Sequence, residues 1–277
     1  MLFRSRLITL QKNADGLVIG GTTGESSTLE PCDLDYLLKL AKNLLPNKTI
    51  IAATGSNCTK KALELQKIAQ KAQADALLSI VPYYNKPTQK GLFAHFSFLA
   101  QNTDLPMIIY NNPARTIIDI EINTLKNLLS QHKNIVGLKE SNTNMQRVDD
   151  IYSMLKEHDY KLSIMGGDDE CFAQFMQHNA AGMISTISNL CLFEMQTAYK
   201  AFEQNEYDYA CKIAHKLEAF SRLIFSYSNP LVLKTILAHM NLIKPYFRLP
   251  LCPLEQNEQD KIINEFNKFD WLKINKR

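Results

Sequence analysis

The stretch "NIVGLKESN", Asn134 to Asn142, joins an apolar run directly to a lysine and a glutamate. Its apolar residues follow one another instead of alternating with polar ones, which is typical of a parallel β-strand buried on both faces. Lys139 and Glu140 stand at the carboxyl end of this predicted strand. Either Lys139 is a solvated strand end, or the fold places its amine in a pocket.

Similar apolar runs recur along the chain, separated by stretches in which leucine and alanine have helical spacing. The runs occupy residues 16–21, 49–55, 76–82, 106–112, 134–140, 162–168 and 182–188. This alternation predicts an α/β fold whose parallel strands are joined by right-handed crossovers. The sheet is either open and doubly wound or closed into a TIM (β/α)₈ barrel. Because a barrel needs about eight strands, the seven runs predict a barrel that lacks its first strand.

The pattern changes after residue 205, because no further β-rich run occurs. Helical spacing continues over 206–226, 230–241 and 255–268, and a proline-containing connector precedes the last of these stretches. We therefore predict two domains. A (β/α) barrel, shortened at its N-terminus, spans residues 1–205, and a small C-terminal helical domain spans 206–277.

The composition excludes several classes of protein. The 31 basic and 28 acidic residues nearly balance, which does not favour a nucleic-acid partner. The six cysteines are scattered and form no CxxC pair, so we expect reduced thiols and neither a metal nor a cofactor. No apolar run is long enough to cross a membrane, and residues 1–12 lack the features of a signal peptide. These observations predict a cytoplasmic protein.

Reactive side chains follow several of the predicted strands, at the end of the sheet where ligands bind in parallel α/β folds. They are Thr22, Thr23, Tyr83, Tyr84, Tyr110, Arg115, Lys139, Gly167 and Asp168. No histidine stands at these positions, which argues against Ser/His/Asp and Cys/His catalysis. Each residue also has a purely structural interpretation: a turn, a core tyrosine, a solvated arginine or, for Asp168 and Asp169, a helix cap.

A lysine in an apolar pocket is desolvated, which favours the neutral amine. A neutral amine attacks a carbonyl to form a Schiff base, and the imine then acts as an electron sink for carbon–carbon bond formation or cleavage. A tyrosine beside hydroxyl groups is a suitable proton shuttle, and the Thr22-Thr23 loop is a candidate anchor for a keto-acid carboxylate. The residues by themselves therefore predict a Schiff-base aldolase-type lyase.

Several segments resemble the family of dihydrodipicolinate synthase and N-acetylneuraminate lyase. They are "GGTTGESSTL", "PYYNKPTQKGLFAHF", "IIYNNPARTIID", "IVGLKESN", "GGDDECFAQFM", "GMISTISN" and, later, "NPLVLK" and "RLPLCPL". The arginine of "NNPART" is similar to the synthase branch, whose second substrate carries a carboxylate. The resemblance implies condensation of pyruvate with L-aspartate 4-semialdehyde to 4-hydroxy-tetrahydrodipicolinate, in lysine and diaminopimelate biosynthesis.

The resemblance also implies a role for each site residue. Lys139 forms the imine with pyruvate, and Tyr110 relays protons with Thr22 and with Tyr84 from a neighbouring subunit. The remaining four bind substrate. Thr23 holds the pyruvate carboxylate together with Thr22, and Arg115 holds the second substrate. Gly167 and Ile184 supply backbone groups near the imine. The family is typically a homotetramer built as a dimer of dimers, which we expect here.

Two departures from the family pattern stand out. Family members begin earlier, with a first barrel strand, and residues 1–14 match the family's first helix only loosely. We therefore expect a mis-assigned start or a decayed gene, with a less stable product that is either active or inactive. In many bacterial synthases lysine binds at the dimer interface, at positions that match Ser26, Ser27, Pro31, Leu34, Asn57, Lys61 and Tyr83. Pro31 and Leu34 replace histidines, and Lys61 replaces an acid, which predicts weak or absent feedback inhibition.

Two other functions remain open from the sequence. One is a 2-keto-sugar-acid aldolase of the same family, which would not need Arg115. The other is a catalytically inactive remnant that acts as a binding or oligomerisation partner.

Overall fold

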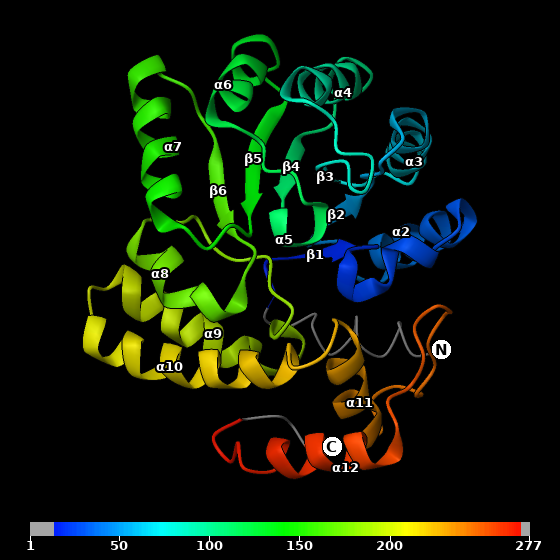
Figure 1. The fold of residues 1–277 in the computed structure, drawn as a ribbon, viewed down its shortest axis with the longest axis vertical. Coiled ribbons are helices and arrows are strands. Elements are labelled where there is room, and N and C mark those ends of the chain that lie inside the picture. The colour runs from blue at the N-terminus through cyan, green and yellow to red at the C-terminus, as the bar shows by residue number, and fades with distance from the viewer. Residues whose placement is uncertain (1–13, 273–277) are drawn as a thin grey trace.

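The computed structural model describes residues 14–272, which form one curled parallel sheet surrounded by helices (Figure 1). The six strands follow one another in chain order across the sheet, and every neighbouring pair is parallel. Their bounds are β1 Gly16–Ile19, β2 Thr49–Ala53, β3 Ala76–Ile80, β4 Met107–Asn111, β5 Ile135–Glu140 and β6 Ser163–Gly166. This is a TIM-like arrangement, and the first six predicted runs are confirmed as strands.

The seventh predicted strand is wrong in its extent. Residues 182–188 contain a single isolated β-bridge, between Met183 and Gly166. The ladder stops there because the backbone N–H groups of Thr186 and Ile187 donate to the side chain of Asp169, at 2.8 and 3.0 Å. Closure into eight strands therefore stays a prediction. The expectations for the first strand and the first helix fall on or before residues 1–13, outside the described part of the chain.

Helices cover the outside of the sheet. Those joining successive strands are α2 Pro31–Leu44, α3 Thr59–Lys71, α4 Gln89–Gln101, α5 Pro113–Thr116, α6 Ile122–Gln131 and α7 Met145–His158. Local sequence explains where they begin: α2, for example, has proline at its first position and a capping box between Glu30 and Asp33. Ser26–Thr28 forms a short 3-10 turn before Glu30 takes the N-cap position of α2.

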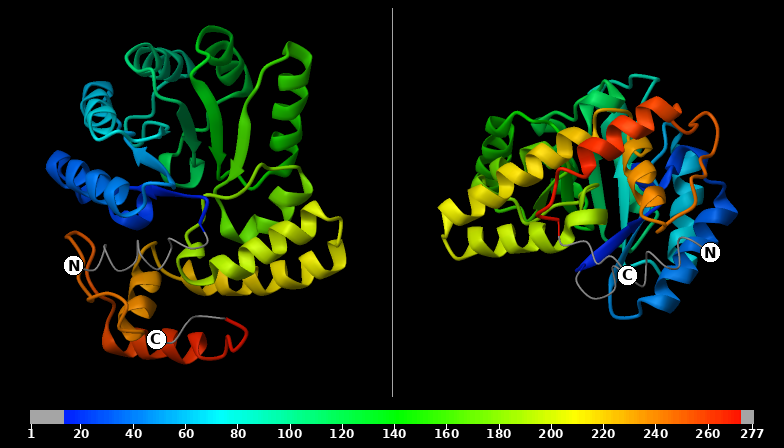
Figure 2. Two further views of the ribbon diagram at one scale, coloured as in Figure 1. Left: turned by 180° about the vertical axis from the view of Figure 1, so that it is seen from behind. Right: turned by 90° about the horizontal axis from the view of Figure 1, so that it is seen from below.

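The remaining helices lie beyond the carboxyl ends of the strands (Figures 1 and 2). They are α8 Phe172–Gln177, α9 Ser188–Glu203, α10 Tyr207–Ile224, α11 Leu231–His239 and α12 Gln256–Phe266. The last three confirm the helices expected after residue 205, whereas the domain boundary at that residue stays a prediction. None of the helices within 14–272 is long and apolar enough to cross a membrane.

Candidate active site

A cavity of about 740 Å³ lies against the curled sheet and reaches the carboxyl ends of β4 and β5, where Tyr110 and Lys139 line it. Seven of the eight predicted site residues line it: Thr22, Thr23, Tyr110, Arg115, Lys139, Gly167 and Ile184. Residues 16–18 of β1 and residues 181–186 also line it. Within residues 14–272, no group of three histidine, cysteine or acidic side chains has the arrangement of a metal site.

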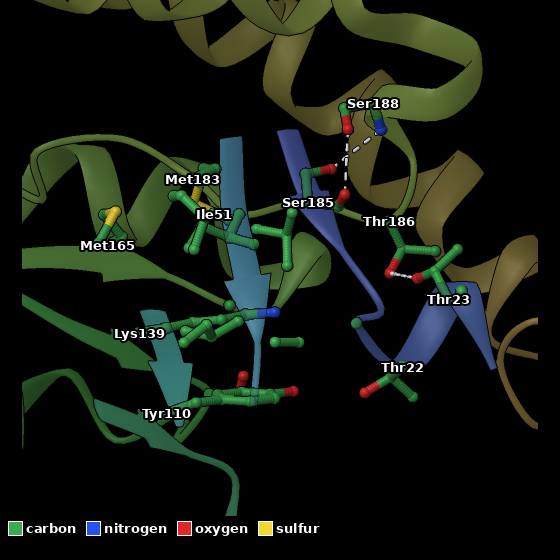
Figure 3. A pocket seen from close by; sticks show the side chains of 18 of the residues that line it. Thr22, Thr23, Ile51, Tyr110, Lys139, Met165, Met183, Ser185, Thr186 and Ser188 are labelled. Carbon is green, nitrogen blue, oxygen red and sulfur yellow. Dashed lines mark hydrogen bonds between the residues drawn. The ribbon is translucent and has the colours of Figure 1, made fainter. Parts of the chain in front are cut away.

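Lys139 and Tyr110 face each other at the centre of this cavity (Figure 3). The Lys139 Nζ atom lies 4.2 Å from the centroid of the Tyr110 ring. The two residues are register partners on β5 and β4, so their side chains leave the sheet on the same face. An irregularity between Met107 and Ile108 shifts the register by one residue. Without this shift Tyr110 would pair with Leu138, whose side chain points the other way.

The Tyr110 phenol is tied to its own strand end. The side-chain amide of Asn112 donates to the phenol oxygen at 2.7 Å. Burial raises the pKa of Tyr110. The charge of Lys139, hydrogen bonds with Asn112 and Ser141 and the charge of Arg115 together outweigh burial, so the pKa lies below its ordinary value. No hydrogen bond joins Tyr110 to Thr22 within the described residues, although the Thr22 hydroxyl points toward the ring (Figure 3). The proton relay between them stays a prediction.

Gly167 forms the wall directly behind Lys139. A Cβ atom at this position would lie 2.3 Å from Ser141 Oγ and 2.7 Å from Lys139 Cε, which is closer than real contacts allow. Its backbone N–H donates to the Glu140 carbonyl oxygen at 2.7 Å and holds the glycine against β5. A larger residue here would therefore displace the Lys139 or Ser141 side chain, because the glycine backbone packs directly against them.

The lysine's neighbour Glu140 points away from the cavity and is fully buried. It accepts hydrogen bonds from Asn111 at 2.7 Å, from the Asn142 backbone at 2.7 Å and from Arg147 at 3.0 Å. Burial raises the pKa of Glu140, and the Arg147 charge opposes that rise. This network ties the ends of β4 and β5 together and keeps the Lys139 backbone in place.

Thr23 is bound from two distant parts of the chain. Its hydroxyl oxygen lies 3.2 Å from that of Thr186 and 3.0 Å from the donating Asn229 side-chain amide. Sequence reasoning missed both partners. Thr186 lies at the end of an expected strand, and Asn229 opens the segment "NPLVLK", which carried the family resemblance but received no role.

Arg115 and Tyr84 lie at the exposed limits of the site. Arg115 lines the cavity from α5 and makes no ion pair within the described residues, so its guanidinium is available to an anion. Tyr84 does not line the cavity and is 85% exposed. Asp168 caps the turn after β6 through the Glu170 N–H, as predicted. The cap predicted for Asp169 is wrong, because its carboxylate accepts from the Thr186 and Ile187 N–H groups instead.

Comparison with known proteins shows which family this chain belongs to. The model of the dihydrodipicolinate synthetase family matches residues 5–268. This chain belongs to the dihydrodipicolinate synthetase family. It is 36% identical over 257 residues to 4-hydroxy-tetrahydrodipicolinate synthase of Thermodesulfovibrio yellowstonii, covering 91% of this chain and 86% of that protein.

Solved structures of family members superpose closely. The dihydrodipicolinate synthase of Aquifex aeolicus matches with a TM-score of 0.93 at 33% identity, over 99% of this chain and 93% of the other. The 4-hydroxy-tetrahydrodipicolinate synthase of Methylacidiphilum fumariolicum gives 0.91 at 35% identity, over 96% and 89%. The resemblance inferred from the sequence is thereby confirmed, and the cavity around Lys139 is the candidate active site of a dihydrodipicolinate synthetase family member.

Proposed function

We propose that this chain condenses pyruvate with L-aspartate 4-semialdehyde to give 4-hydroxy-tetrahydrodipicolinate, a step of lysine and diaminopimelate biosynthesis. The observation that carries the proposal is the position of the Lys139 amine, 4.2 Å above the Tyr110 ring in a cavity also lined by Thr22 and Thr23. An amine, a tyrosine with a lowered pKa and a cluster of hydroxyl donors are the groups that Schiff-base chemistry on a keto acid needs.

The chemistry begins when the Lys139 ammonium group loses a proton and the resulting amine attacks the C2 carbonyl of pyruvate. The resulting carbinolamine loses water to give the imine, and loss of a methyl proton converts the imine to an enamine. The enamine carbon then attacks the aldehyde of the second substrate and forms the new carbon–carbon bond. The amine of the condensed product attacks C2, closes the ring and releases Lys139. Tyr110 carries protons in these steps, because its lowered pKa eases release of the phenol proton and leaves a phenolate that takes a proton back from the substrate.

The other site residues bind the substrates. Thr22 and Thr23 receive the pyruvate carboxylate, while backbone groups of Gly167 and Ile184 surround the imine. Arg115, at the exposed side of the cavity, receives the carboxylate of the semialdehyde, for which a guanidinium has matching geometry. Tyr84 is directed out of its own subunit and is assigned to the site of a neighbouring subunit in a homotetramer. We place the protein in the cytoplasm.

Borohydride trapping tests the proposal. Pyruvate and borohydride together should add the mass of one reduced pyruvyl group to the peptide that contains Lys139. Lys139→Met should abolish the adduct, whereas Lys133→Met, an exposed lysine before the same strand, should leave it unchanged. If wild-type protein forms no adduct, the chain is an inactive remnant and the proposal falls.

The Arg115→Ala variant distinguishes the synthase from the alternative function, a keto-sugar-acid aldolase. Losing a charged hydrogen bond of about 1.5–3 kcal/mol should raise KM for aspartate semialdehyde about tenfold to a hundredfold and leave KM for pyruvate unchanged. Arg222→Ala, an exposed arginine on α10, is the matched control. An equal KM for the semialdehyde in wild type and Arg115→Ala, together with turnover of a keto-sugar acid, would favour the aldolase.

A further inference from the structure

Three polar side chains from separate parts of the chain meet at one wall of the cavity. Thr23 follows β1, Thr186 precedes α9, and Asn229 precedes α11. The Asn229 Nδ2 atom lies 3.0 Å from the Thr23 hydroxyl and 3.3 Å from the Thr186 hydroxyl, and the two hydroxyls are 3.2 Å apart. All three residues line the cavity, and Asn229 is only 6% exposed.

The number of hydrogens in this triangle limits what each hydroxyl can do. An amide nitrogen only donates, so both threonine oxygens accept from Asn229. One hydroxyl hydrogen is used between Thr23 and Thr186. Neither hydroxyl donates to any other acceptor within residues 14–272, so one hydrogen remains for a ligand in the cavity. A group that accepts hydrogen bonds and carries negative charge suits that hydrogen best.

We propose that Asn229 is a positioning residue: by donating to the Thr23 and Thr186 oxygens, it leaves one hydroxyl hydrogen of this pair to donate to the carboxylate of the keto acid. This inference rests on the proposed function, because it assigns the carboxylate end of the pyruvate site. It adds Thr186 and Asn229 to that end of the site. It also makes the segment before α11 part of the active site and not an appendage.

The same C-terminal segment holds the loop that carries Thr23. Lys234 of α11 forms an ion pair with Glu25, and the Arg248 backbone N–H donates to the second Glu25 oxygen at 3.0 Å. Glu25 has a left-handed backbone, with φ at 58°, which a residue other than glycine keeps only when its surroundings hold it. The C-terminal segment therefore contacts this loop at two places, through Asn229 on Thr23 and through Lys234 and Arg248 on Glu25. Both contacts hold Thr23 near Asn229.

Asn229→Asp tests the inference because it keeps the size of the side chain and replaces the donor with a negatively charged acceptor. The hydroxyl hydrogens should then turn toward Asp and away from the cavity, and the charge should repel a carboxylate. The pyruvate concentration that gives half-maximal borohydride trapping at Lys139 should rise about tenfold or more. Asn229→Ala, which only removes the donor, should give a smaller rise.

An uncharged ketone separates positioning from general damage. Acetone also forms an imine with a reactive lysine but has no carboxylate, so Asn229→Asp should trap acetone as wild type does. Asn127→Asp, which adds the same charge at an exposed position of α6, is the control. Pyruvate trapping by Asn229→Asp at the wild-type concentration would overturn the inference, as would equal losses for pyruvate and acetone. Absence of any pyruvate adduct in wild type would instead remove the proposed function, and the inference with it.

Discussion

Lys139 and Tyr110 are register partners on neighbouring parallel strands, and the lysine Nζ atom lies 4.2 Å from the centroid of the tyrosine ring. The positive charge therefore acts on the phenol through the protein interior, where Coulomb interactions are stronger than in water. The two groups are electrostatically coupled before any substrate binds.

Removing the charge should raise the pKa of Tyr110. Burial alone raises that pKa, and Lys139 is the strongest of the effects that lower it, so Lys139→Met should move the phenol titration to higher pH. Ultraviolet titration of each protein, minus that of its Tyr110→Phe counterpart, isolates this one phenol among the 11 tyrosines. Lys133→Met should cause no change. An unchanged Tyr110 titration in Lys139→Met would show that the two groups are not coupled.

Gly167→Ala should strongly reduce turnover. The added methyl group would overlap with Ser141 Oγ and Lys139 Cε, so the lysine side chain must move from its place above Tyr110. A misplacement of about 1 Å reduces catalysis by about a hundredfold, and the rate of pyruvate trapping should fall with kcat.

Gly91→Ala is the matched control for this substitution. The same methyl group on α4 would meet its nearest neighbour at 3.3 Å and leave the cavity untouched. Its turnover should equal that of wild type. Wild-type kcat in Gly167→Ala would show that the backbone at this position does not determine where the lysine lies.

Arg248→Met should change stability in a pH-dependent way. Hydrogen bonds from the Arg248 side chain and from the Glu30 backbone N–H lower the pKa of Asp33 from 3.8 to about 2. Because the folded-state pKa lies below the unfolded one, this stabilisation is complete above about pH 4 and disappears as the pH falls toward 2. Urea unfolding midpoints of wild type and Arg248→Met should differ at pH 6 and converge near pH 2. A constant difference across this range would contradict the assignment.

Millimolar lysine should leave the rate of this enzyme nearly unchanged. Two of the positions matched to the family's inhibitory site bear apolar residues, and Leu34 is buried in the core at 3% exposure. Lys61 adds a positive charge that repels the ammonium group of the effector. Lys61→Glu should therefore increase lysine binding measured by calorimetry, and halving of the wild-type rate by millimolar lysine would refute the prediction.

The sequence by itself determined the first six strands and the candidate nucleophile. A strand covered on both faces must be apolar along its whole length, so each of the first six runs is visible without any partner. Lys139 is conspicuous for the same reason, because a charged residue directly follows such a run. The three C-terminal helices were equally predictable from their spacing.

The tertiary structure decided how these pieces meet. The seventh apolar run, residues 182–188, does not continue as a strand because of Asp169. Its carboxylate accepts hydrogen bonds from the Thr186 and Ile187 N–H groups, which therefore do not pair within the sheet. The pairing of Tyr110 with Lys139 depends on a one-residue shift between β4 and β5, which no apolar pattern reveals. Asn229 lies 206 residues from Thr23 along the chain. Hydrogen bonds of this kind form only after packing has brought their donors and acceptors together, so local sequence carries no signal for them.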